Sequence, residues 1–256
     1  MPKIALISDA HGNLEALVAV LRDIDSEAGV DLLACLGDAV GYGPDPAPCV
    51  DLIARVCDAV VVGNHDKAVL MESEPANFNP TAAHSLAVTR GLLSDRHLDT
   101  IGNWPERDTI AGIDLVHASF GRRRLAYVLN ARRAADSFSG MGAKIGVFGH
   151  THMPSMFACP IGDALDAEPA GATIRSALPL PADVRSELPA SHRVLLNPGS
   201  VGQPRDRNPD AAWGMLDTDA MTFRIRRVRY DIDEVERKIR DRGLPDFLHK
   251  RLRVGA

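Results

Sequence analysis

The stretch Lys3-Ile4-Ala5-Leu6-Ile7-Ser8-Asp9-Ala10-His11-Gly12-Asn13 decides how this chain folds. Its apolar run from Ile4 to Ile7 has the length of a buried β-strand. Asp9 and His11 follow that run, and residues two apart at a strand end point the same way. A carboxylate and an imidazole so placed can bind one metal ion. The stretch therefore predicts a buried strand that ends in a polar, metal-binding site.

Four further apolar runs end in the same kind of residue. In open α/β sheets, ligands collect beyond the carboxyl ends of the strands. The chain has 9 His among 256 residues, so five of them at such ends are not expected by chance. Together with the first stretch, these segments predict a site for two metal ions. The four further runs and the residues that follow them are Leu32 to Leu36 with Gly37-Asp38, Ala59 to Val62 with Gly63-Asn64-His65-Asp66, Ile113 to Val116 with His117, and Ile145 to Phe148 with Gly149-His150-Thr151-His152.

Between these runs the chain alternates between helix and strand. The first third reads as β-α-β-α-β, the pattern of a parallel sheet, with helices over 13–28 and through Leu52 and Ile53. Residues 66–103 are predicted to be mostly helical, with breaks near Pro75 and around Ser94. The later elements are strands over 109–111, 194–196, 214–216 and 222–228, helices over 130–138 and 233–242 with a short one after Gly243, and short strands joined by loops over 161–192.

Length and composition indicate an ordinary globular protein. We expect a single domain over residues 1–256, with a C-terminal helical segment from about residue 231. The net charge of -5 gives no support for a nucleic-acid surface. The four cysteines form no C-x-x-C pair and are expected to be free thiols in a reducing cytosol. No stretch approaches the roughly 18 apolar residues of a membrane span. A soluble, cytoplasmic protein is expected.

The ordered set D-x-H, G-D, G-N-H-D, a lone His and G-H-x-H resembles the calcineurin-like metallophosphoesterase superfamily. The later segment Asn197-Pro198-Gly199-Ser200-Val201-Gly202-Gln203-Pro204-Arg205-Asp206 resembles a branch of small single-domain bacterial and archaeal phosphodiesterases. The likeness thus extends over most of the chain. It implies an α/β fold in which two facing mixed β-sheets are flanked by helices, an αββα sandwich with the metals at one sheet edge.

The same resemblance implies a role for each motif residue. Asp9, His11 and His152 would hold one ion, Asp38 would bridge the pair, and Asn64, His117 and His150 would hold the other. His65 would protonate the leaving group and Asp66 would orient His65, raising its pKa. The cofactors implied are two divalent ions, with Mn²⁺ favoured over Fe, Zn or Ni, and a hydroxide that bridges them would be the nucleophile.

One departure from the superfamily bears on the substrate. Where protein phosphatases and diadenosine tetraphosphatases place an Arg shortly after the bridging Asp, this chain reads Gly37-Asp38-Ala39-Val40-Gly41-Tyr42-Gly43. A phosphate monoester benefits most from a bidentate guanidinium. The sequence therefore favours a phosphodiesterase acting on a small phosphodiester or nucleotide, and it leaves a homo-oligomer open. The alternatives are a phosphomonoesterase or protein phosphatase of the same fold, and a non-catalytic metal-holding regulatory protein.

Several residues keep two interpretations. Asn13 contacts phosphate or caps a helix, and Arg205 contacts phosphate or pairs with Asp206 or Asp210. Asp9, Asp38 and Asn64 could cap helices, and His117 could be a core histidine. Four other histidines match no ligand spacing and are interpreted as surface or helix-face residues, namely His84, His97, His192 and His249. The runs Arg122 to Arg124 and Arg224 to Arg229 are interpreted as solvated, with the first near enough to His117 to attract anions.

Overall fold

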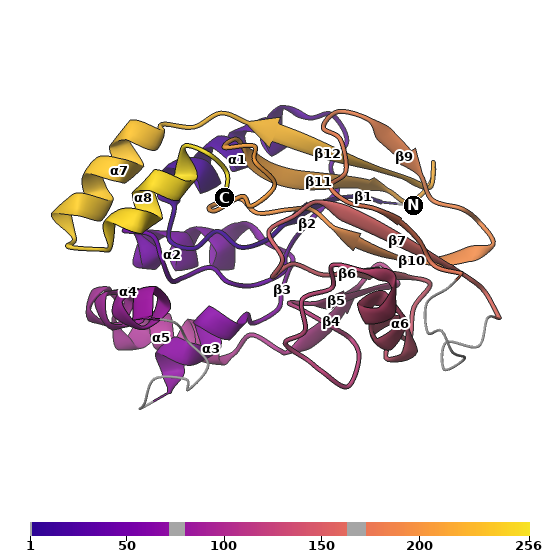
Figure 1. The fold of residues 1–256 in the computed structure, drawn as a ribbon, viewed down its shortest axis with the longest axis horizontal. Helices are drawn as coiled ribbons and strands as arrows, with labels where there is room; N and C mark the ends of the chain where they lie inside the picture. Colours follow the sequence, from indigo (N-terminus) through magenta and orange to yellow (C-terminus); the bar gives the residue numbers. More distant parts are fainter. Residues whose placement is uncertain (1, 72–79, 163–172) are drawn as a thin grey trace.

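The computed structural model describes residues 2–71, 80–162 and 173–256 and contains two six-stranded mixed sheets that face each other (Figure 1). The first sheet consists of β1 (Lys3–Ile7), β2 (Leu32–Cys35), β3 (Ala59–Val60), β9 (Arg185–Glu187), β11 (Ala211–Asp217) and β12 (Thr222–Val228). Its strand order is β3-β2-β1-β11-β12-β9. Strands β1, β2 and β3 are parallel neighbours, which confirms the predicted parallel start of the chain.

The second sheet consists of β4 (Arg107–Ile110), β5 (Ile113–Val116), β6 (Ile145–Val147), β7 (Ser155–Pro160), β8 (Arg175–Ala177) and β10 (His192–Asn197). Its strand order is β4-β5-β6-β10-β7-β8, with parallel pairing from β5 through β6 to β10. Both sheets therefore combine parallel and antiparallel pairing. The predicted α/β fold with two facing mixed sheets is confirmed.

Eight helices lie in the described part of the chain. They are α1 (Leu14–Ser26), α2 (Pro46–Val56), α3 (Asn64–Leu70), α4 (Pro80–Leu92), α5 (Asp95–Gly102), α6 (Ala131–Ser139), α7 (Ile232–Asp241) and α8 (Asp246–Leu252). Ser94 is the N-cap of α5, in agreement with the predicted break around Ser94, whereas the predicted break near Pro75 lies outside the described residues. None of the described helices has the length and apolar character that a membrane crossing requires.

Strand β1 shows how the layers share one chain. Its side chains alternate between the two faces of the sheet. Ile4 and Leu6 belong to the apolar layer between the sheets, which also contains Leu115 of β5. Ala5 and Ile7 face the opposite way and pack in the cluster that holds the apolar residues of α1 and α2. The alternation fixes the register of β1, because a slip of one residue would exchange its two faces.

Helices cover the outer faces of both sheets. Phe138 of α6 packs with Phe148 and Phe157 on the second sheet. The C-terminal helices α7 and α8 pack through Val235, Ile239 and Leu248 against Tyr42 and neighbouring residues. Tyr42 lies in the loop that follows β2, so the C-terminal helices contact the loop that carries the predicted site residue Asp38.

That residues 1–256 form a single domain stays a prediction.

Two strands differ from expectation. β3 ends at Val60 rather than at Val62, because the Val62 amide donates to the Pro105 carbonyl oxygen (2.8 Å) and so leaves the ladder with β2. Strand β7 is not predicted by the sequence, yet it pairs with β10 along its whole length. Its residues Ser155-Met156-Phe157-Ala158-Cys159-Pro160 carry no clear alternation, since four of the six are buried.

The hairpin between β4 and β5 generates a stability prediction. Its two-residue turn has positive φ at Ala111 (49°) and Gly112 (78°), and Ala111 is exposed. Alanine is disfavoured in this left-handed region, so Ala111→Gly should stabilise the fold by about 0.5–1 kcal/mol despite the greater freedom of glycine in the unfolded chain. Ala54→Gly, at an exposed position within α2, should destabilise it by about 1 kcal/mol. Urea unfolding measures both, and a destabilising Ala111→Gly would contradict the turn assignment.

Candidate metal centre

The structure brings the predicted ligands together beyond the carboxyl ends of the strands. Asp9, His11 and His152 form one buried cluster, and Asp38, His117 and His150 form another. Within each cluster the potential ligand atoms all lie within 4.8 Å of one another. Asn64, the seventh predicted ligand, places its Oδ1 3.1 Å from Nε2 of His117. Residues widely separated in sequence thus converge on one site.

The backbone at this site is strained. Five of the seven predicted ligands have positive φ, a conformation that costs a residue with a Cβ about 1–2 kcal/mol. They are Asp9 (55°), His11 (47°), Asp38 (54°), His150 (64°) and His152 (59°). Hydrogen bonds between loops hold them, since the amides of Asp9 and His11 donate to the carbonyl oxygens of Gly37 and Asp38 (both 2.9 Å). Strain of this kind persists where the surroundings over-determine it, typically at functional sites.

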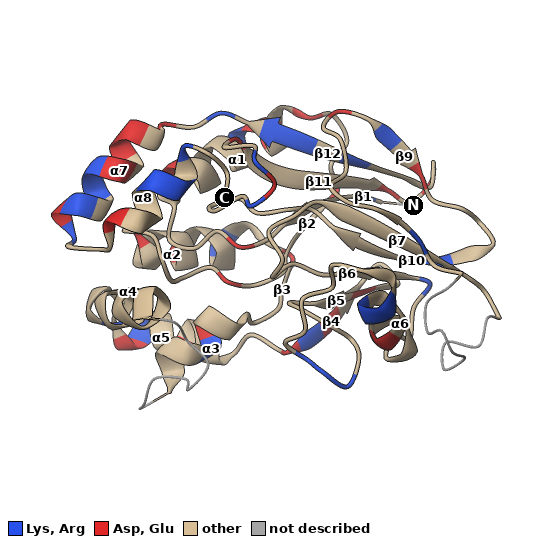
Figure 2. Cartoon of the chain, in the orientation of Figure 1, with Lys and Arg blue, Asp and Glu red and all other residues tan. Residues whose placement is uncertain are grey.

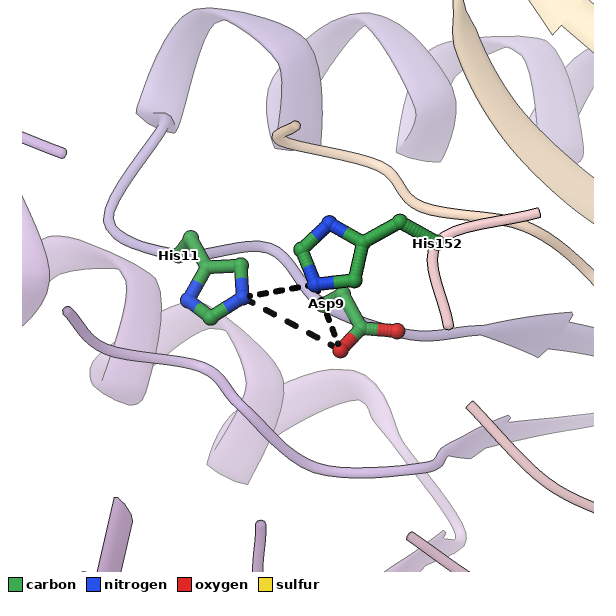
Figure 3. Close-up of side chains that lie close together, drawn as sticks. All are labelled: Asp9, His11 and His152. Carbon is green, nitrogen blue, oxygen red and sulfur yellow. Dashed lines mark hydrogen bonds and ion pairs between the residues drawn. The ribbon is translucent and has the colours of Figure 1, made fainter. Parts of the chain in front are cut away.

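Figure 3 shows the first cluster. Nε2 of His11 lies 3.2 Å from Nε2 of His152, and Oδ1 of Asp9 lies 3.4 Å from Nε2 of His152 and 3.9 Å from that of His11. The other carboxylate oxygen of Asp9 accepts hydrogen bonds from the Ser8 hydroxyl (2.6 Å) and the His150 amide (3.0 Å). Oδ1 itself is buried and has no hydrogen-bond partner in the described structure. It is the carboxylate atom that faces the two imidazoles.

Backbone carbonyl groups fix the tautomers of three histidines that are predicted ligands. Nδ1 of His11 lies 2.9 Å from the Val40 oxygen, that of His152 lies 2.6 Å from the Gln203 oxygen, and that of His117 lies 2.7 Å from the Leu36 oxygen. A carbonyl oxygen only accepts, so each Nδ1 donates. In the neutral imidazole the lone pair is then on Nε2, the atom that points into the site. Such outer partners orient metal-binding histidines.

Burial keeps the first pair of histidines neutral. Desolvation holds the pKa of both His11 and His152 well below the usual range for histidine. Their Nε2 atoms therefore present lone pairs to each other at 3.2 Å, with a carboxylate oxygen beside them. No hydrogen bond can relieve this arrangement between two acceptors. A divalent cation among the three atoms satisfies all of them, so the residues fit the divalent metal that the resemblance implies.

Asp38 lies between the two clusters. Its Oδ2 is 3.7 Å from Nε2 of His11 and 3.3 Å from Nε2 of His117, and its Oδ1 accepts a hydrogen bond from the His65 amide (2.8 Å). Burial favours the neutral acid, but the imidazoles of His117, His65 and His11 outweigh it and hold the pKa of Asp38 well below its usual range. An ionised oxygen in contact with both clusters is what a bridging ligand requires.

The two histidines of the second cluster have pKa values shifted in opposite directions. Nε2 of His117 lies 3.2 Å from Nδ1 of His150. Burial opposes the charge of His117, but Asp38 raises its pKa to about 9, whereas burial lowers the pKa of His150 to about 3. Burial also raises the pKa of Asp9 to about 7. Opposite shifts of this size in one buried site are typical of functional positions.

His65 and Asp66 occupy the centre of the site in different ways. His65 is buried, and its ring lies 4.9 Å from that of His11 and 4.5 Å from that of Tyr42. Asp66 accepts hydrogen bonds from the amides of Asp38 (2.7 Å), Gly63 (3.0 Å) and Val40 (3.2 Å), so it positions the loop that carries Asp38, the predicted bridging residue. Sequence reasoning missed this role. That Asp66 also orients His65 stays a prediction.

The expected pKa of His65 was wrong in direction. A histidine that acts as a general acid was expected to have its pKa raised by a carboxylate, but burial lowers the pKa of His65 to about 4, although Asp38 acts to raise it. The imidazole is therefore neutral near pH 7 and carries one N–H group. His65 also belongs to a third cluster of potential ligand atoms, with His11 and Asp38.

The two predicted substrate contacts differ. The Asn13 side chain caps α1, because its Oδ1 accepts from the Ala16 amide (3.1 Å), and its Nδ2 donates to the Gly202 oxygen (2.9 Å). This supports the capping interpretation. Arg205 does not form the expected ion pair, since Asp206 pairs with Arg227 instead. Nη2 of Arg205 donates to Oε1 of Gln203 (2.8 Å), and its buried Nε has no partner in the described structure.

Arg205 lies near the metal centre. Its positive charge lowers the pKa of His152, His65 and Asp9. Two aromatic residues near the ligands were not predicted. The Tyr127 ring stacks on His150 at 4.2 Å and remains about half exposed at 49%, and Tyr42 lies 4.8 Å from the His11 ring. Tyr42 lies in the segment after Asp38 that the sequence singles out for its missing arginine, but nothing in the sequence placed its ring against His11, and Tyr127 follows no strand-end motif.

The remaining histidines and arginines divide as follows. His249 is buried on α8 beside Glu236, whereas His84, His97 and His192 are partly or fully exposed. Arg122 to Arg124 are exposed, as expected. The expectation for Arg224 to Arg229 is partly wrong, because Arg226 pairs with Asp23 (2.9 Å) and Arg227 forms a largely buried pair. On β12 these long side chains reach acidic groups of α1 and of a neighbouring loop.

The comparisons with known proteins agree with this geometry. The model of the calcineurin-like phosphoesterase family matches residues 2–154, which include all seven predicted ligands. An uncharacterised protein from Methanocaldococcus jannaschii is 34% identical over 98% of both chains. The crystal structure of a metallophosphoesterase from Sphaerobacter thermophilus has a TM-score of 0.84 and 34% identity, covering 100% of this chain and 99% of that one. A symmetrical bis(5'-nucleosyl)-tetraphosphatase from an Enterobacter species is 31% identical over 43% of this chain and 38% of its own length.

Fold and site together define a metal-dependent phosphoesterase. The chain belongs to the calcineurin-like phosphoesterase family and carries the buried His and Asp clusters of a metallophosphoesterase. Its membership rests on the family match over more than half of the chain and on relatives that match nearly its full length.

Gly63 offers a test of how closely the bridging carboxylate is packed. A Cβ at this position would lie 2.0 Å from Oδ1 and 2.3 Å from the amide nitrogen of Asp38. Gly63→Ala should therefore displace Asp38, lower the bound metal below two ions per chain, and destabilise the fold by about 1–3 kcal/mol. Gly91→Ala is the matched control, because its Cβ would meet nothing within 4 Å. Metal analysis after gel filtration measures both variants, and a Gly63→Ala protein that keeps two metals would contradict the packing.

Proposed function

We propose that this protein is a dinuclear metal-dependent phosphodiesterase that hydrolyses a small phosphodiester or a nucleotide. The observation that carries the proposal is the position of Asp38, whose Oδ2 contacts imidazoles of both clusters. A shared carboxylate keeps two ions close together, and ions about 3.5–4 Å apart suit phosphoester hydrolysis. The symmetrical bis(5'-nucleosyl)-tetraphosphatase noted above acts on a nucleotide by its name, and it matches 43% of this chain, which supports a nucleotide as the substrate.

The ligands divide between two ions. Asp9, His11 and His152 would hold the first, Asn64, His117 and His150 the second, and Asp38 both. Bound there, the ions would neutralise phosphate charge and supply a nucleophile at neutral pH. The mixed oxygen and imidazole donors suit Mn²⁺, which we favour over Fe, Zn or Ni. The four free cysteines agree with a reducing, cytoplasmic setting.

His65 would act on the leaving group. Its neutral imidazole carries one N–H group that would donate a hydrogen bond to the departing oxygen and stabilise the negative charge that develops there, and the departed oxygen would then take its proton from water. The amide of His65 is anchored on Oδ1 of Asp38, so the ring keeps a fixed place beside the bridging carboxylate. Asp66 supports the same loop through the Asp38 and Val40 amides. We expect His65 to contribute to the rate without holding a metal.

The loop after Asp38 favours a diester. It presents Tyr42, with positive φ (61°) and its ring against His11 and His65, where the protein phosphatases and diadenosine tetraphosphatases of the superfamily carry an arginine. A diester has one negative charge, whereas a monoester dianion has two and depends more on guanidinium contacts. Arg205, at the side of the first cluster, is the candidate contact for the phosphate oxygens.

The alternative with a specific observation in its favour is a phosphomonoesterase. The buried Nε of Arg205 has no partner in the described structure, and such a donor suits a second phosphate oxygen. A non-catalytic, metal-holding protein is disfavoured, because all seven ligand positions and His65 are filled. A small phosphorylated molecule is the expected partner.

Hydrolysis of two chromogenic esters tests the proposed function. With Mn²⁺ present, bis(p-nitrophenyl) phosphate should be cleaved with a kcat/KM at least about tenfold above that for p-nitrophenyl phosphate, a difference of ~1.4 kcal/mol. Removal of metal with a chelator should abolish the activity, and Mn²⁺ should restore it. A higher kcat/KM for the monoester would favour the phosphomonoesterase. If neither ester were cleaved with Mn²⁺, Fe, Zn or Ni present, the non-catalytic regulatory protein would be favoured.

The role of His65 predicts a dependence on the leaving group. His65→Ala should keep two metals and lower kcat by roughly 10² to 10⁴ for an alkyl or nucleoside ester, where the departing oxygen carries the most negative charge and depends on the hydrogen bond from His65. A p-nitrophenyl ester should lose much less, because the phenolate leaves unaided. Gly91→Ala provides a control for handling and folding. Equal losses on both esters with unchanged metal content would assign His65 to phosphate binding instead.

A further inference from the structure

A groove of about 1420 Å³ lies beside the loop that connects β5 to α6. Six arginines line it, namely Arg107, Arg122, Arg123, Arg124, Arg132 and Arg133. Asp136 is the one acidic side chain among the described residues that line it. Figure 2 shows the basic colour gathered on this loop and on α6. The groove is therefore strongly positive, although the net charge of the whole chain is -5.

Most of this charge is not used within the fold. Arg107 donates to the Gly140 and Phe120 carbonyl oxygens, and Arg124 pairs with Glu106. For the other four arginines no ion pair is found in the described part of the chain. Arginines elsewhere in the protein differ, as the pairing of Arg226 with Asp23 shows. Like charges gathered with few counter-charges repel one another, and an anionic ligand relieves that repulsion.

The groove shares lining residues with a pocket at the metal centre. A second pocket of about 410 Å³ is lined by Asn64 and His117, two of the predicted metal ligands. Arg107 and Arg124 line both this pocket and the groove. A ligand whose reacting group lies at the second cluster can therefore extend past Leu125, which is exposed, into the arginines.

The start of α6 adds to the positive potential. Arg132 and Arg133 lie in its first turn, and Oδ1 of Asn130 accepts from the Arg133 amide (3.0 Å). The unpaired amides of a helix N-terminus carry partial positive charge. This contribution has the same sign as the guanidinium groups and adds to the potential of the same groove.

We propose that this arginine groove binds the distal phosphate groups of an extended substrate while its scissile phosphate lies at the metal centre. The inference rests on the proposed phosphodiesterase function and adds the substrate class. A volume above the roughly 300–1,000 Å³ usual for small-ligand pockets suits more than one nucleotide unit. The shared chemistry is a series of phosphates, which a short single-stranded oligonucleotide or a nucleoside polyphosphate can supply.

The test uses the double variant Arg132→Ala/Arg133→Ala, since alanine preserves the helix. The matched control is Arg22→Ala/Arg55→Ala, which removes the same charge from exposed positions of α1 and α2. Three substrates are compared, namely pentathymidylate, ATP and bis(p-nitrophenyl) phosphate. The last of these has no distal phosphate. Affinity for fluorescein-labelled pentathymidylate is measured in parallel on the full chain with chelator present, so that binding is read without turnover.

The proposal predicts a selective effect on extended substrates. The groove variant should have a KM about tenfold higher than that of the wild type for pentathymidylate or for ATP. If pentathymidylate is affected, the variant should also bind the labelled oligonucleotide more weakly. The salt dependence of log Kd should fall by about 1 for each phosphate that the variant no longer binds. Its rate on bis(p-nitrophenyl) phosphate and the control variant should be unchanged. An effect on pentathymidylate identifies an oligonucleotide, and an effect on ATP alone identifies a nucleoside polyphosphate.

Two results would overturn the groove without touching the phosphodiesterase assignment. One is equal KM values for wild type and groove variant on both extended substrates. The other is an equal reduction of kcat/KM for the groove variant on all three substrates, which would indicate that the variant disturbs the structure. Failure of the wild type to cleave bis(p-nitrophenyl) phosphate would instead overturn the proposed function itself.

Discussion

The buried carboxylate of Asp38 is the constraint on which the rest of the site depends. One of its oxygens faces imidazoles of both clusters, and the other accepts the His65 amide. Asp66 holds the Asp38 amide, and Gly63 leaves the space that the carboxylate occupies. His65, Asp66 and Gly63 all follow β3. The segments after β2 and β3 are therefore built as a single support for one ionised group.

Strain in the ligand loops follows from the same constraint. Five of the predicted ligands adopt left-handed backbone conformations at the ends of the strands. The free energy of these conformations is of the order of 1–2 kcal/mol for each residue. Interloop hydrogen bonds, such as that from the His11 amide to the Asp38 oxygen, offset part of this cost. A bound cation would offset more, because it also relieves the buried, partnerless oxygen of Asp9 in the described structure.

Much of the fold and of the ligand set could be predicted from sequence, because both have local signals. Buried runs such as Ile4 to Ile7 identify strands, and the Asp or His that follows each run identifies the site. What could not be predicted depends on contacts between distant segments. Asp66 binds backbone amides across the β2 loop, Tyr127 stacks on His150, and Asp206 pairs with Arg227 rather than with its neighbour Arg205. β7 lacked a local signal, because most of its residues are buried and no alternation marks one face.

The dinuclear centre is tested most directly by anomalous diffraction from crystals grown with Mn²⁺. The account predicts two anomalous peaks about 3.5–4 Å apart, one beside Asp9, His11 and His152 and one beside Asn64, His117 and His150, with Asp38 in contact with both. A single peak, or two peaks that Asp38 does not join, would contradict it.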